Sequence, residues 1–340
     1  MKLVSFLFGN EERTGLWYEN KVYDLAEGAK VINISLPVKM ADLLKAEEEG
    51  LNLARKVDNA IKQGRITSSL NEDTYKILAP VPHPTSCRDA YAFRQHVATA
   101  RRNRGVEMIP EFDQFPVFYF TNNNSIYGEG DIVVEDDHLR HLDFELESAI
   151  VIGKRGKNIS YKDADNYIAG FMVMNDLSAR VLQMDEMKLN LGPAKGKDFA
   201  TTIGPWLVTP DELDDKLIKT DFGNSYSLRM TAKHNDRMVS HGNMKDMNWT
   251  FAEIIERASY GVELYPGDII GSGTVGTGCY LELNGTWELE AKARGEEYTP
   301  VWLKNGDEIE LEITGLGILK NRIIKSNNSL SILSKKKSIK

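Results

Sequence analysis

The sequence predicts an α+β fold that is rich in strands, with a small N-terminal α+β domain ahead of a larger, strand-dominated one. Most apolar runs are short. They either alternate with polar residues or are fully apolar, as half-buried and buried strands are. Three prolines fall within residues 80–84, which neither a helix nor a central strand accommodates. We therefore expect domains over residues 1–80 and 81–325, followed by a basic, disordered tail over residues 326–340.

The N-terminal region predicts a small β-meander followed by helices. Residues 1–25 alternate over short runs that Gly-Asn and Glu-Asn turn signals separate. Residues 38–64 are rich in helix formers and charges, so we expect one or two surface helices there. Residues 75–78 are typical of a short strand that ends at the prolines.

The second region contains many short strands and few long helices. In chain order we expect a helix over 88–104, an aromatic strand over 115–121, a strand over 142–152, a helical segment over 161–168, a buried strand over 169–174, a strand over 203–208, a hairpin over 225–242, a helix over 251–259, a strand with a glycine-rich loop over 266–278, a short strand over 280–283 and a strand pair over 307–318.

Composition excludes several classes of protein. The 340 residues carry a formal net charge of −8, which argues against nucleic acid as a partner. The sequence has no apolar run near the length of a membrane span, and its first residues are typical of a strand rather than a secretion signal. The two cysteines, Cys87 and Cys279, form no metal or disulfide pattern. We expect a cytoplasmic protein without membrane contact.

An acidic strand is the most informative stretch. Asp143, Glu145 and Glu147 alternate with apolar residues, so period two places the three carboxylates on one face. The fully apolar run over 149–152 follows directly, where water is scarce. A hard divalent cation would offset the repulsion between the carboxylates. The alternative is a solvated edge strand with an acidic face.

Asp176 lies at the end of the next buried strand, and two interpretations of it are open as well. A carboxylate at the end of an apolar strand is well placed to bind a ligand, but it could also cap the helical turn that follows. In that turn Arg180 and Gln183 lie three residues apart and share a face.

A single histidine stands out on the helix predicted over 88–104. His96 lies seven residues after Asp89, two turns along the same side of that helix. A lone helical histidine is more often a surface or core residue than a functional one. The nearby Arg101, Arg102 and Arg104 could form a solvated face or hold an anionic substrate.

Taken together, an ordered series of motifs resembles the fumarylacetoacetate hydrolase family over residues 80–320. The motifs are Arg88-Asp89 with Arg94-Gln95-His96, Phe118-Tyr119, Leu142-Asp143-Phe144-Glu145-Leu146-Glu147, Met174-Asn175-Asp176-Leu177-Ser178-Ala179-Arg180, Gly196-Lys197-Asp198-Phe199-Ala200-Thr201-Thr202, Gly271-Ser272-Gly273-Thr274 and Leu281-Glu282-Leu283. The resemblance implies a mixed β-roll catalytic domain, a homodimer and a divalent cation, namely Mg²⁺, Ca²⁺ or Mn²⁺.

The resemblance also implies roles for individual residues. The ligands of the cation would be Asp89, Glu145, Glu147 and Asp176. His96 matches the general base and Glu282 the carboxylate that orients it. The polar groups around the reacting carbonyl would be Arg180, Gln183 and Lys197. The substrate contacts would be Tyr91, Tyr119 and Thr274, with Arg101 and Arg104 holding a distal carboxylate.

The activity that the resemblance implies is hydrolysis of a carbon–carbon bond in a 1,3-diketo acid of the fumarylacetoacetate or acylpyruvate type, as in aromatic amino acid catabolism. His96 would activate the water that attacks the carbonyl. The alternative is a hydratase, dehydratase or decarboxylase of a 2-oxo acid. Because His96 and Glu282 are both present, a non-enzymatic binding protein is the least favoured reading. Met187 stands where fumarylacetoacetases carry a tyrosine, so the substrate is less certain than the metal site.

Overall fold

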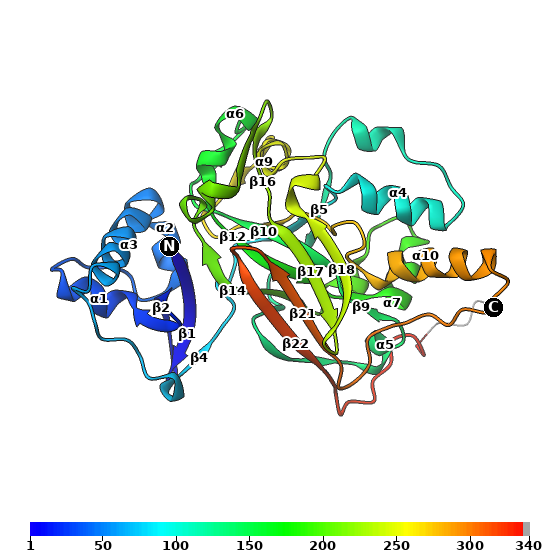
Figure 1. The fold of residues 1–340 in the computed structure, drawn as a ribbon, viewed down its shortest axis with the longest axis horizontal. Coiled ribbons are helices and arrows are strands. Elements are labelled where there is room, and N and C mark those ends of the chain that lie inside the picture. The colour runs from blue at the N-terminus through cyan, green and yellow to red at the C-terminus, as the bar shows by residue number, and fades with distance from the viewer. Residues whose placement is uncertain (336–340) are drawn as a thin grey trace.

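The computed structural model describes residues 1–335, and two open sheets dominate it (Figure 1). The larger sheet has eleven strands in the order β3-β2-β1-β14-β12-β10-β20-β5-β6, with β4 pairing with β1 and β7 with β14. Its members are β1 (Lys2–Phe8), β2 (Glu11–Tyr18), β3 (Lys21–Asp24), β4 (Tyr75–Ile77), β5 (Cys87–Ala90), β6 (Phe118–Thr121), β7 (Ile126–Tyr127), β10 (Leu146–Ile152), β12 (Ile168–Asp176), β14 (Thr201–Val208) and β20 (Ile269–Gly271).

The second sheet has five strands and packs against the larger one through a shared hydrophobic core. Its order is β18 (Arg237–Asn243), β17 (Arg229–His234), β21 (Glu308–Ile313), β22 (Gly317–Lys325) and β8 (Gly130–Val134). The core between the sheets joins Ile150 and Phe171 of the larger sheet to Leu311 and Leu319 of the smaller one. The remaining strands of the described residues form three two-stranded sheets: β9 (Leu142–Asp143) with β13 (Ser178–Ala179), β11 (Gly156–Lys157) with β19 (Glu263–Leu264), and β15 (Leu217–Thr220) with β16 (Gly223–Tyr226).

The helices surround the sheets. They are α1 (Leu25–Val31), α2 (Met40–Lys45), α3 (Glu47–Lys62), α4 (Arg94–Asn103), α5 (Asp136–Leu139), α6 (Tyr161–Ala164), α7 (Arg180–Met187), α8 (Ala194–Lys197), α9 (Phe251–Ser259) and α10 (Tyr280–Ala293). Short 3₁₀ turns are η1 (Glu72–Thr74), η2 (Pro110–Asp113), η3 (Asp165–Tyr167), η4 (Pro210–Lys216) and η5 (Met244–Asp246). Helices α4, α7 and α10 lie together at the side of the molecule away from the N-terminal strands (Figure 1).

The strand-rich α+β class that the sequence predicts is confirmed. The N-terminal meander, the helices within residues 38–64, the buried strand after residue 168 and the helix over Phe251–Ser259 are all present. Strand β1 pairs with β14, Leu3 opposite Leu207, so the first 80 residues and the rest of the chain share one sheet. The domain boundary near residue 80 stays a prediction.

Three predicted elements are wrong. The helix expected over 88–104 begins only at Arg94, because Cys87–Ala90 forms β5, a buried strand between β20 and β6. The strand expected over 280–283 is the first turn of α10. The single acidic strand is interrupted: β9 ends at Asp143 and β10 begins at Leu146. The reading of its carboxylates as a solvated face is also wrong, because all three are buried.

The end of the chain extends the second sheet further than expected. Strand β22 runs to Lys325, beyond the pair predicted over 307–318. After it, the Ser331 hydroxyl and the backbone N–H groups of Ile332 and Leu333 donate to the buried Asp137 carboxylate. The disordered tail expected over residues 326–340 stays a prediction, and residues 336–340 of it lie outside the described residues. Across residues 1–335, no helix has the length and apolar character that crossing a membrane requires.

Candidate metal centre and active site

Four carboxylates meet at one end of the central strands. Strand β5 supplies Asp89, β10 supplies Glu147, β12 ends on Asp176, and Glu145 lies in the break before β10. One carboxylate oxygen of each lies within 4.8 Å of the others, and all four side chains are buried. The pairing of β5 with β20, and of β10 with both β20 and β12, brings together residues that are far apart in sequence. All four predicted metal ligands are therefore neighbours, although Asp89 comes from a strand rather than the expected helix.

Burial and mutual repulsion perturb these carboxylates. Burial, together with the charge of Asp176, raises the pKa of Asp89 to about 8. Burial and the neighbouring Asp89 raise the pKa of Glu147 well above its usual value. Burial would raise the pKa of Glu145 too, but Lys197 and Arg180 reverse this and lower it. When all four carboxylates are ionised, the cluster carries more negative charge than the two contacting cations, Arg180 and Lys197, offset.

The donor set fits a hard divalent cation. The cluster offers only carboxylate oxygens, which are the ligands that Mg²⁺, Ca²⁺ and Mn²⁺ prefer. Asp176 Oδ1 is buried and, among the described residues, has no hydrogen-bond partner. A buried carboxylate oxygen without a partner is costly, and a bound cation would remove that cost.

Two buried cations contact the cluster. Lys197, from α8, donates from Nζ to Glu145 and, at 2.5 Å, to Asp176. Arg180 begins α7 and donates from Nη2 to Glu145 at 2.7 Å. Its Nη1 donates to Gln183 Oε1 at 2.9 Å, which bears out the shared face expected for these two residues. These contacts raise the pKa of both cations despite their burial, so both stay charged.

Asp143 does not belong to the four-carboxylate cluster and has a different role. Its Oδ2 accepts from Arg180 Nε at 2.8 Å and from Nη2 at 2.7 Å. The same carboxylate accepts from the backbone N–H groups of Tyr280 at 2.7 Å and Leu281 at 2.9 Å. These are the first two residues of α10, whose own N-cap residue makes no side-chain cap. Asp143 therefore holds both Arg180 and the start of α10, which sequence reasoning missed.

A histidine and a carboxylate form a buried pair beside the cluster. His96 Nδ1 lies 2.7 Å from Glu282 Oε2, although the two residues are 186 positions apart. Glu282 Oε1 accepts from the backbone N–H of Thr277 at 3.0 Å, which fixes the carboxylate. The edge of the Tyr91 ring meets the imidazole at a centroid distance of 5.9 Å. Cys279 also lies beside this pair, its Sγ within 4.8 Å of both ligand atoms, and nothing in the sequence pattern had singled it out.

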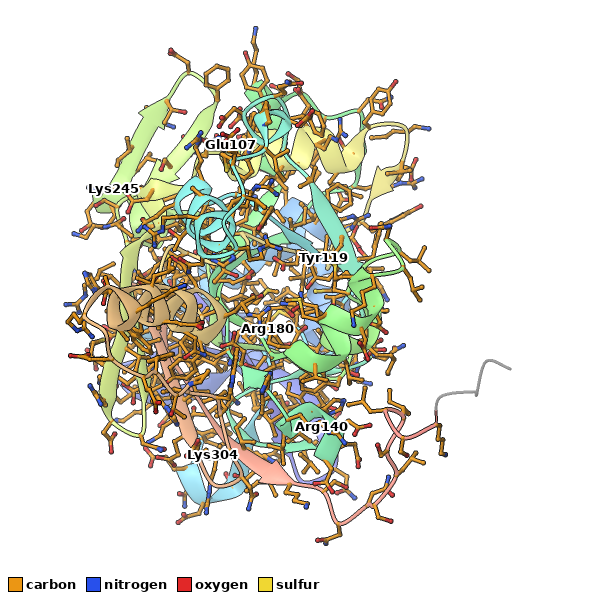
Figure 2. The ribbon with its side chains drawn as sticks, turned by 90° about the vertical axis from the view of Figure 1, so that its right-hand side faces the viewer. Glu107, Tyr119, Arg140, Arg180, Lys245 and Lys304 are labelled. Carbon is orange, nitrogen blue, oxygen red and sulfur yellow. The ribbon has the colours of Figure 1, made fainter. Side chains whose placement is uncertain are left out.

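A cavity of about 610 Å³ opens onto both groups. Of the predicted site residues, those that line it are Asp89, Tyr91, His96, Arg104, Tyr119, Glu145, Arg180, Gln183, Lys197 and Thr274. Tyr119 and Arg180 lie on the same side of the molecule (Figure 2). The Tyr119 hydroxyl donates to Asp176 at 2.5 Å, and that of Thr274 to Glu147 at 3.4 Å. Arg101 is not among the lining residues: its Nε donates to the carbonyl of Glu107.

The glycine-rich loop after β20 touches the carboxylates directly. The N–H of Gly273 donates to Asp89 and to Glu147, at 3.1 Å each. Its φ of +79° favours glycine, and a Cβ at this position would lie 2.6 Å from the carbonyl oxygen of Ala90. Glycine at this position therefore lets the backbone approach the two carboxylates closely.

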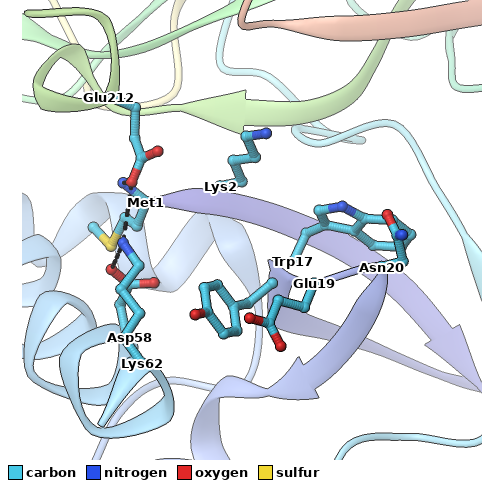
Figure 3. Close-up of a pocket in the computed structure, with 9 residues that line it drawn as sticks. Met1, Lys2, Trp17, Glu19, Asn20, Asp58, Lys62 and Glu212 are labelled. Atoms are coloured by element: carbon cyan, nitrogen blue, oxygen red, sulfur yellow. Dashed lines mark hydrogen bonds and ion pairs between the residues drawn. The ribbon is translucent and has the colours of Figure 1, made fainter.

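A second, smaller pocket of about 300 Å³ lies near the N-terminal strands (Figure 3). Three of its charged groups pair with one another: Lys62 Nζ lies 2.8 Å from Asp58 and 3.2 Å from Glu212. This mutual neutralisation contrasts with the excess negative charge of the four-carboxylate cluster. The larger cavity is therefore the candidate active site.

Comparisons with known proteins give a family match and relatives that align along most of the chain. The family profile described as "Fumarylacetoacetate (FAA) hydrolase C-terminal" matches residues 85–324. The chain is 29% identical over 331 residues to "Oxaloacetate tautomerase Fahd2a, mitochondrial" of Rattus norvegicus, covering 95% of this chain and 92% of the relative. It is 27% identical over 319 residues to "Oxaloacetate tautomerase YisK" of Bacillus subtilis, covering 90% of this chain and 93% of that relative.

A solved structure shares the fold. The maleylpyruvate hydrolase of Sphingobium sp. SYK-6 superimposes with a TM-score of 0.67 at 20% identity, covering 96% of this chain and all of the other. The two relatives above are named tautomerases, whereas the motifs in the sequence led us to expect a carbon–carbon hydrolase. The family match covers most of the chain, and the chain belongs to the fumarylacetoacetate hydrolase family of enzymes, which act on small-molecule acids.

Proposed function

We propose that this protein catalyses the keto–enol interconversion of a small 2-oxo acid such as oxaloacetate, with a divalent cation in the four-carboxylate cluster. The observation that carries the proposal is the His96–Glu282 pair, 2.7 Å apart, with His96 lining the same cavity as Asp89 and Glu145. The names of the rat and Bacillus relatives support oxaloacetate as the first substrate to test.

Asp89, Glu145, Glu147 and Asp176 would hold the cation. Such an ion polarises the substrate carbonyl and favours the enolate, which a neutral site would not stabilise. Lys197 and Arg180 add fixed positive charge beside Glu145, at the point where negative charge develops on the substrate.

His96 carries the proton. Because Glu282 faces Nδ1, the N–H of that nitrogen donates a hydrogen bond to the Glu282 carboxylate, and Nε2 is left as the base. In the direction from ketone to enol, Nε2 would take the proton from the carbon next to the carbonyl and the electron pair would move onto the carbonyl oxygen. That oxygen would then take up a proton from water, and His96 would release its proton to the solvent. The reverse direction returns the proton from His96 to carbon.

A second candidate uses the same pair for hydrolysis of a 2,4-dioxo acid, as the resemblance in the sequence first implied. There His96 would accept a proton from water, which attacks the distal carbonyl. Cleavage of the carbon–carbon bond then gives a carboxylate and the enolate of a 2-oxo acid. The size of the cavity, about 610 Å³, favours keeping this candidate because it exceeds the needs of a four-carbon acid. Hydration, dehydration and decarboxylation of a 2-oxo acid are further outcomes of the same enolate chemistry.

An ultraviolet assay separates these candidates. Purified, Mg²⁺-loaded protein is given enol-oxaloacetate, fumarylacetoacetate, fumarylpyruvate and acetylpyruvate, with His96→Gln as the matched variant. The proposal predicts accelerated loss of enol absorbance with oxaloacetate, abolished by His96→Gln and by chelator, while pyruvate does not form. Loss of diketone absorbance together with carboxylic acid products would assign hydrolysis instead. Rates equal to the uncatalysed ones with all four compounds would refute both.

We also propose a cytoplasmic homodimer, on the resemblance of the sequence to the family. Light scattering of the purified protein measures the assembly: a mass twice that of the chain supports it, and the mass of one chain contradicts it.

A further inference from the structure

The first turn of α10 carries Glu282, and α4 contacts one side of this turn. Helices α4 and α10 lie next to each other (Figure 1). Asn103 Nδ2 of α4 donates to the carbonyl of Glu282 at 2.9 Å, and a Cβ at Gly285 would lie 2.6 Å from the same nitrogen. Glycine at position 285 therefore lets α4 approach α10 closely, but these contacts reach only one face of the helix.

Three side chains connect the opposite face of α10 to the second sheet. Tyr280 precedes Glu282 by two residues, so the two side chains lie about 200° apart around the helix axis. Tyr280 Oη lies 2.6 Å from His234 Nδ1, and His234 Nε2 lies 2.9 Å from Asp307 Oδ2. His234 ends β17 and Asp307 directly precedes β21, two strands that pair with each other. The three residues therefore form a chain from the sheet to the start of α10.

The direction of the hydrogen bonds in this chain follows from its two ends. Burial would raise the pKa of Asp307, but hydrogen bonds from Asn235 Nδ2 at 2.9 Å and from the backbone N–H of Lys304 at 2.8 Å lower it. Asp307 is therefore a carboxylate, which accepts the N–H of His234 Nε2 and leaves Nδ1 as an acceptor. Burial raises the pKa of Tyr280, so its hydroxyl keeps the proton and donates to Nδ1. One imidazole in this tautomer joins the tyrosine to the carboxylate.

Tyr280 is held at three points. Its backbone N–H donates to Asp143 at 2.7 Å, its ring meets Phe144 edge-on with the centroids 5.2 Å apart, and its hydroxyl donates to His234. The residue is only 2% exposed. Side-chain tips lie about 5–6 Å from a helix axis, so a rotation of α10 by about 10° would move the Glu282 carboxylate by about 1 Å. Because Tyr280 lies in the same turn as Glu282, fixing its ring limits this rotation.

We propose that Asp307, His234 and Tyr280 are positioning residues for the base. They fix the rotation of α10 and thereby hold the Glu282 carboxylate against His96. The inference rests on the proposed function only for the role of His96 as the base. None of the three lines the cavity, so they act through Glu282 and not by touching the substrate. A displacement of about 1 Å can lower a rate about a hundredfold, and since the other contacts of α10 stay in place, loss of one hydroxyl should cost part of that.

A double-mutant cycle with Glu282 separates positioning from a general loss of stability. Tyr280→Phe removes the hydroxyl and keeps the ring. With oxaloacetate it should lower kcat about 5- to 20-fold and leave KM and Mg²⁺ affinity within about twofold. In the Glu282→Gln background, where the carboxylate to be positioned is absent, the same change should alter kcat less than about twofold. Tyr226→Phe is the matched control, because Tyr226 is also buried, lies on β16 and does not line the cavity. It should leave kcat unchanged in both backgrounds.

Nuclear magnetic resonance tests the inference without turnover. In Mg²⁺-loaded protein with ¹⁵N-labelled histidine at pH 8, the chemical shifts of the two His96 ring nitrogens report which of them carries the proton, and His96→Gln identifies the signals. Glu282 holds the proton on Nδ1, whereas an unrestrained imidazole favours Nε2–H. Tyr280→Phe and His234→Gln should each shift part of the population to the Nε2–H form. Tyr226→Phe should leave the chemical shifts unchanged.

Two results would overturn the inference. One is an unchanged His96 tautomer in both Tyr280→Phe and His234→Gln, and the other is the same loss of kcat from Tyr280→Phe with and without the Glu282 carboxylate. Failure of the proposed function has a different signature. In that case the tautomer of His96 shifts as expected in the variants, but the unmodified protein converts neither oxaloacetate nor any 2,4-dioxo acid.

Discussion

Replacing Asp143 with asparagine should destabilise the protein and disable the site together. The side chain is fully buried and accepts five hydrogen bonds, two from Arg180 and one each from the backbone N–H groups of Phe144, Tyr280 and Leu281. Asparagine keeps one acceptor oxygen but turns an NH₂ group toward donors. It also leaves Arg180 with Glu145 as its remaining carboxylate contact.

The magnitude follows from the ion pair. Removing one partner of a buried pair costs about 3–5 kcal/mol, because the other charge stays buried. Burial raises the pKa of Asp143 even with Arg180 beside it, so the ion pair as a whole contributes little to the free energy of unfolding. Removing one partner is still costly, because the other charge stays buried. For 340 residues the entropy of unfolding is about 0.7 kcal/mol per degree, so Tm should fall by about 4–7 °C.

The assay combines calorimetry with kinetics. Because Tyr280 and Leu281 directly precede Glu282, loss of their acceptor should disturb the His96–Glu282 pair and lower kcat at least tenfold. Asp137→Asn is the matched control: this carboxylate is also buried, but it contacts Ser331 and the segment after it and does not line the cavity. The control should keep kcat within twofold. A Tm for Asp143→Asn within one degree of the unmodified protein would refute this reasoning.

Three further predictions concern the cation and the proton. His96→Gln should lower kcat about 10²–10⁴-fold with little change in Mg²⁺ affinity, measured by enol absorbance and calorimetry, because it removes only the base; unchanged kcat would exclude that role. Lys197→Met should lower Tm by several degrees in chelator and less in Mg²⁺, because the cation replaces part of the lost charge; equal losses would contradict this. The folded pKa of Asp89, about 8, lies above its unfolded value of 3.8, so the ion-free protein should lose stability as pH rises between these values. Mg²⁺ binds the deprotonated form, so its effect on Tm should be larger at pH 8.5 than at pH 6; a pH-independent effect would contradict the assignment.

The elements that sequence reasoning found best are those with strong local signals. Phe251–Ser259 begins with a capping box of Thr250 and Glu253, and β12 is a continuous apolar run. Strand β5 was missed because it has four residues and its partner β20 lies about 180 positions further along the chain. Its residues precede strong helix formers, so the helix was extended backward over them. The start of α10 was read as a strand because four residues alternate there, while Asp143, which supports the helix terminus, is distant in sequence.

In the candidate site, too, local features could be predicted and contacts between distant segments could not. Residue type was enough to select the carboxylates, because hard cations require oxygen ligands. The carboxylates converge because their strands pair across the sheet. The alternation of residues along one strand does not predict this pairing. This is why Asp143 was grouped with Glu145 and Glu147, although the break between β9 and β10 turns it toward Arg180. The lining of the cavity as a whole could not be predicted, because its side chains come from separate segments with no shared pattern.

The most direct test of the account is to count bound Mn²⁺ by electron paramagnetic resonance at pH 8. The account predicts one tightly bound ion per chain. Glu147→Gln and Asp176→Asn should each lose it, while Asp137→Asn should retain it. Adding N-methyl oxamate to the Mn²⁺-loaded protein should change the spectrum, because the 2-oxo acid head binds next to the ion. Retention of one ion per chain in both Glu147→Gln and Asp176→Asn would contradict the four-carboxylate centre.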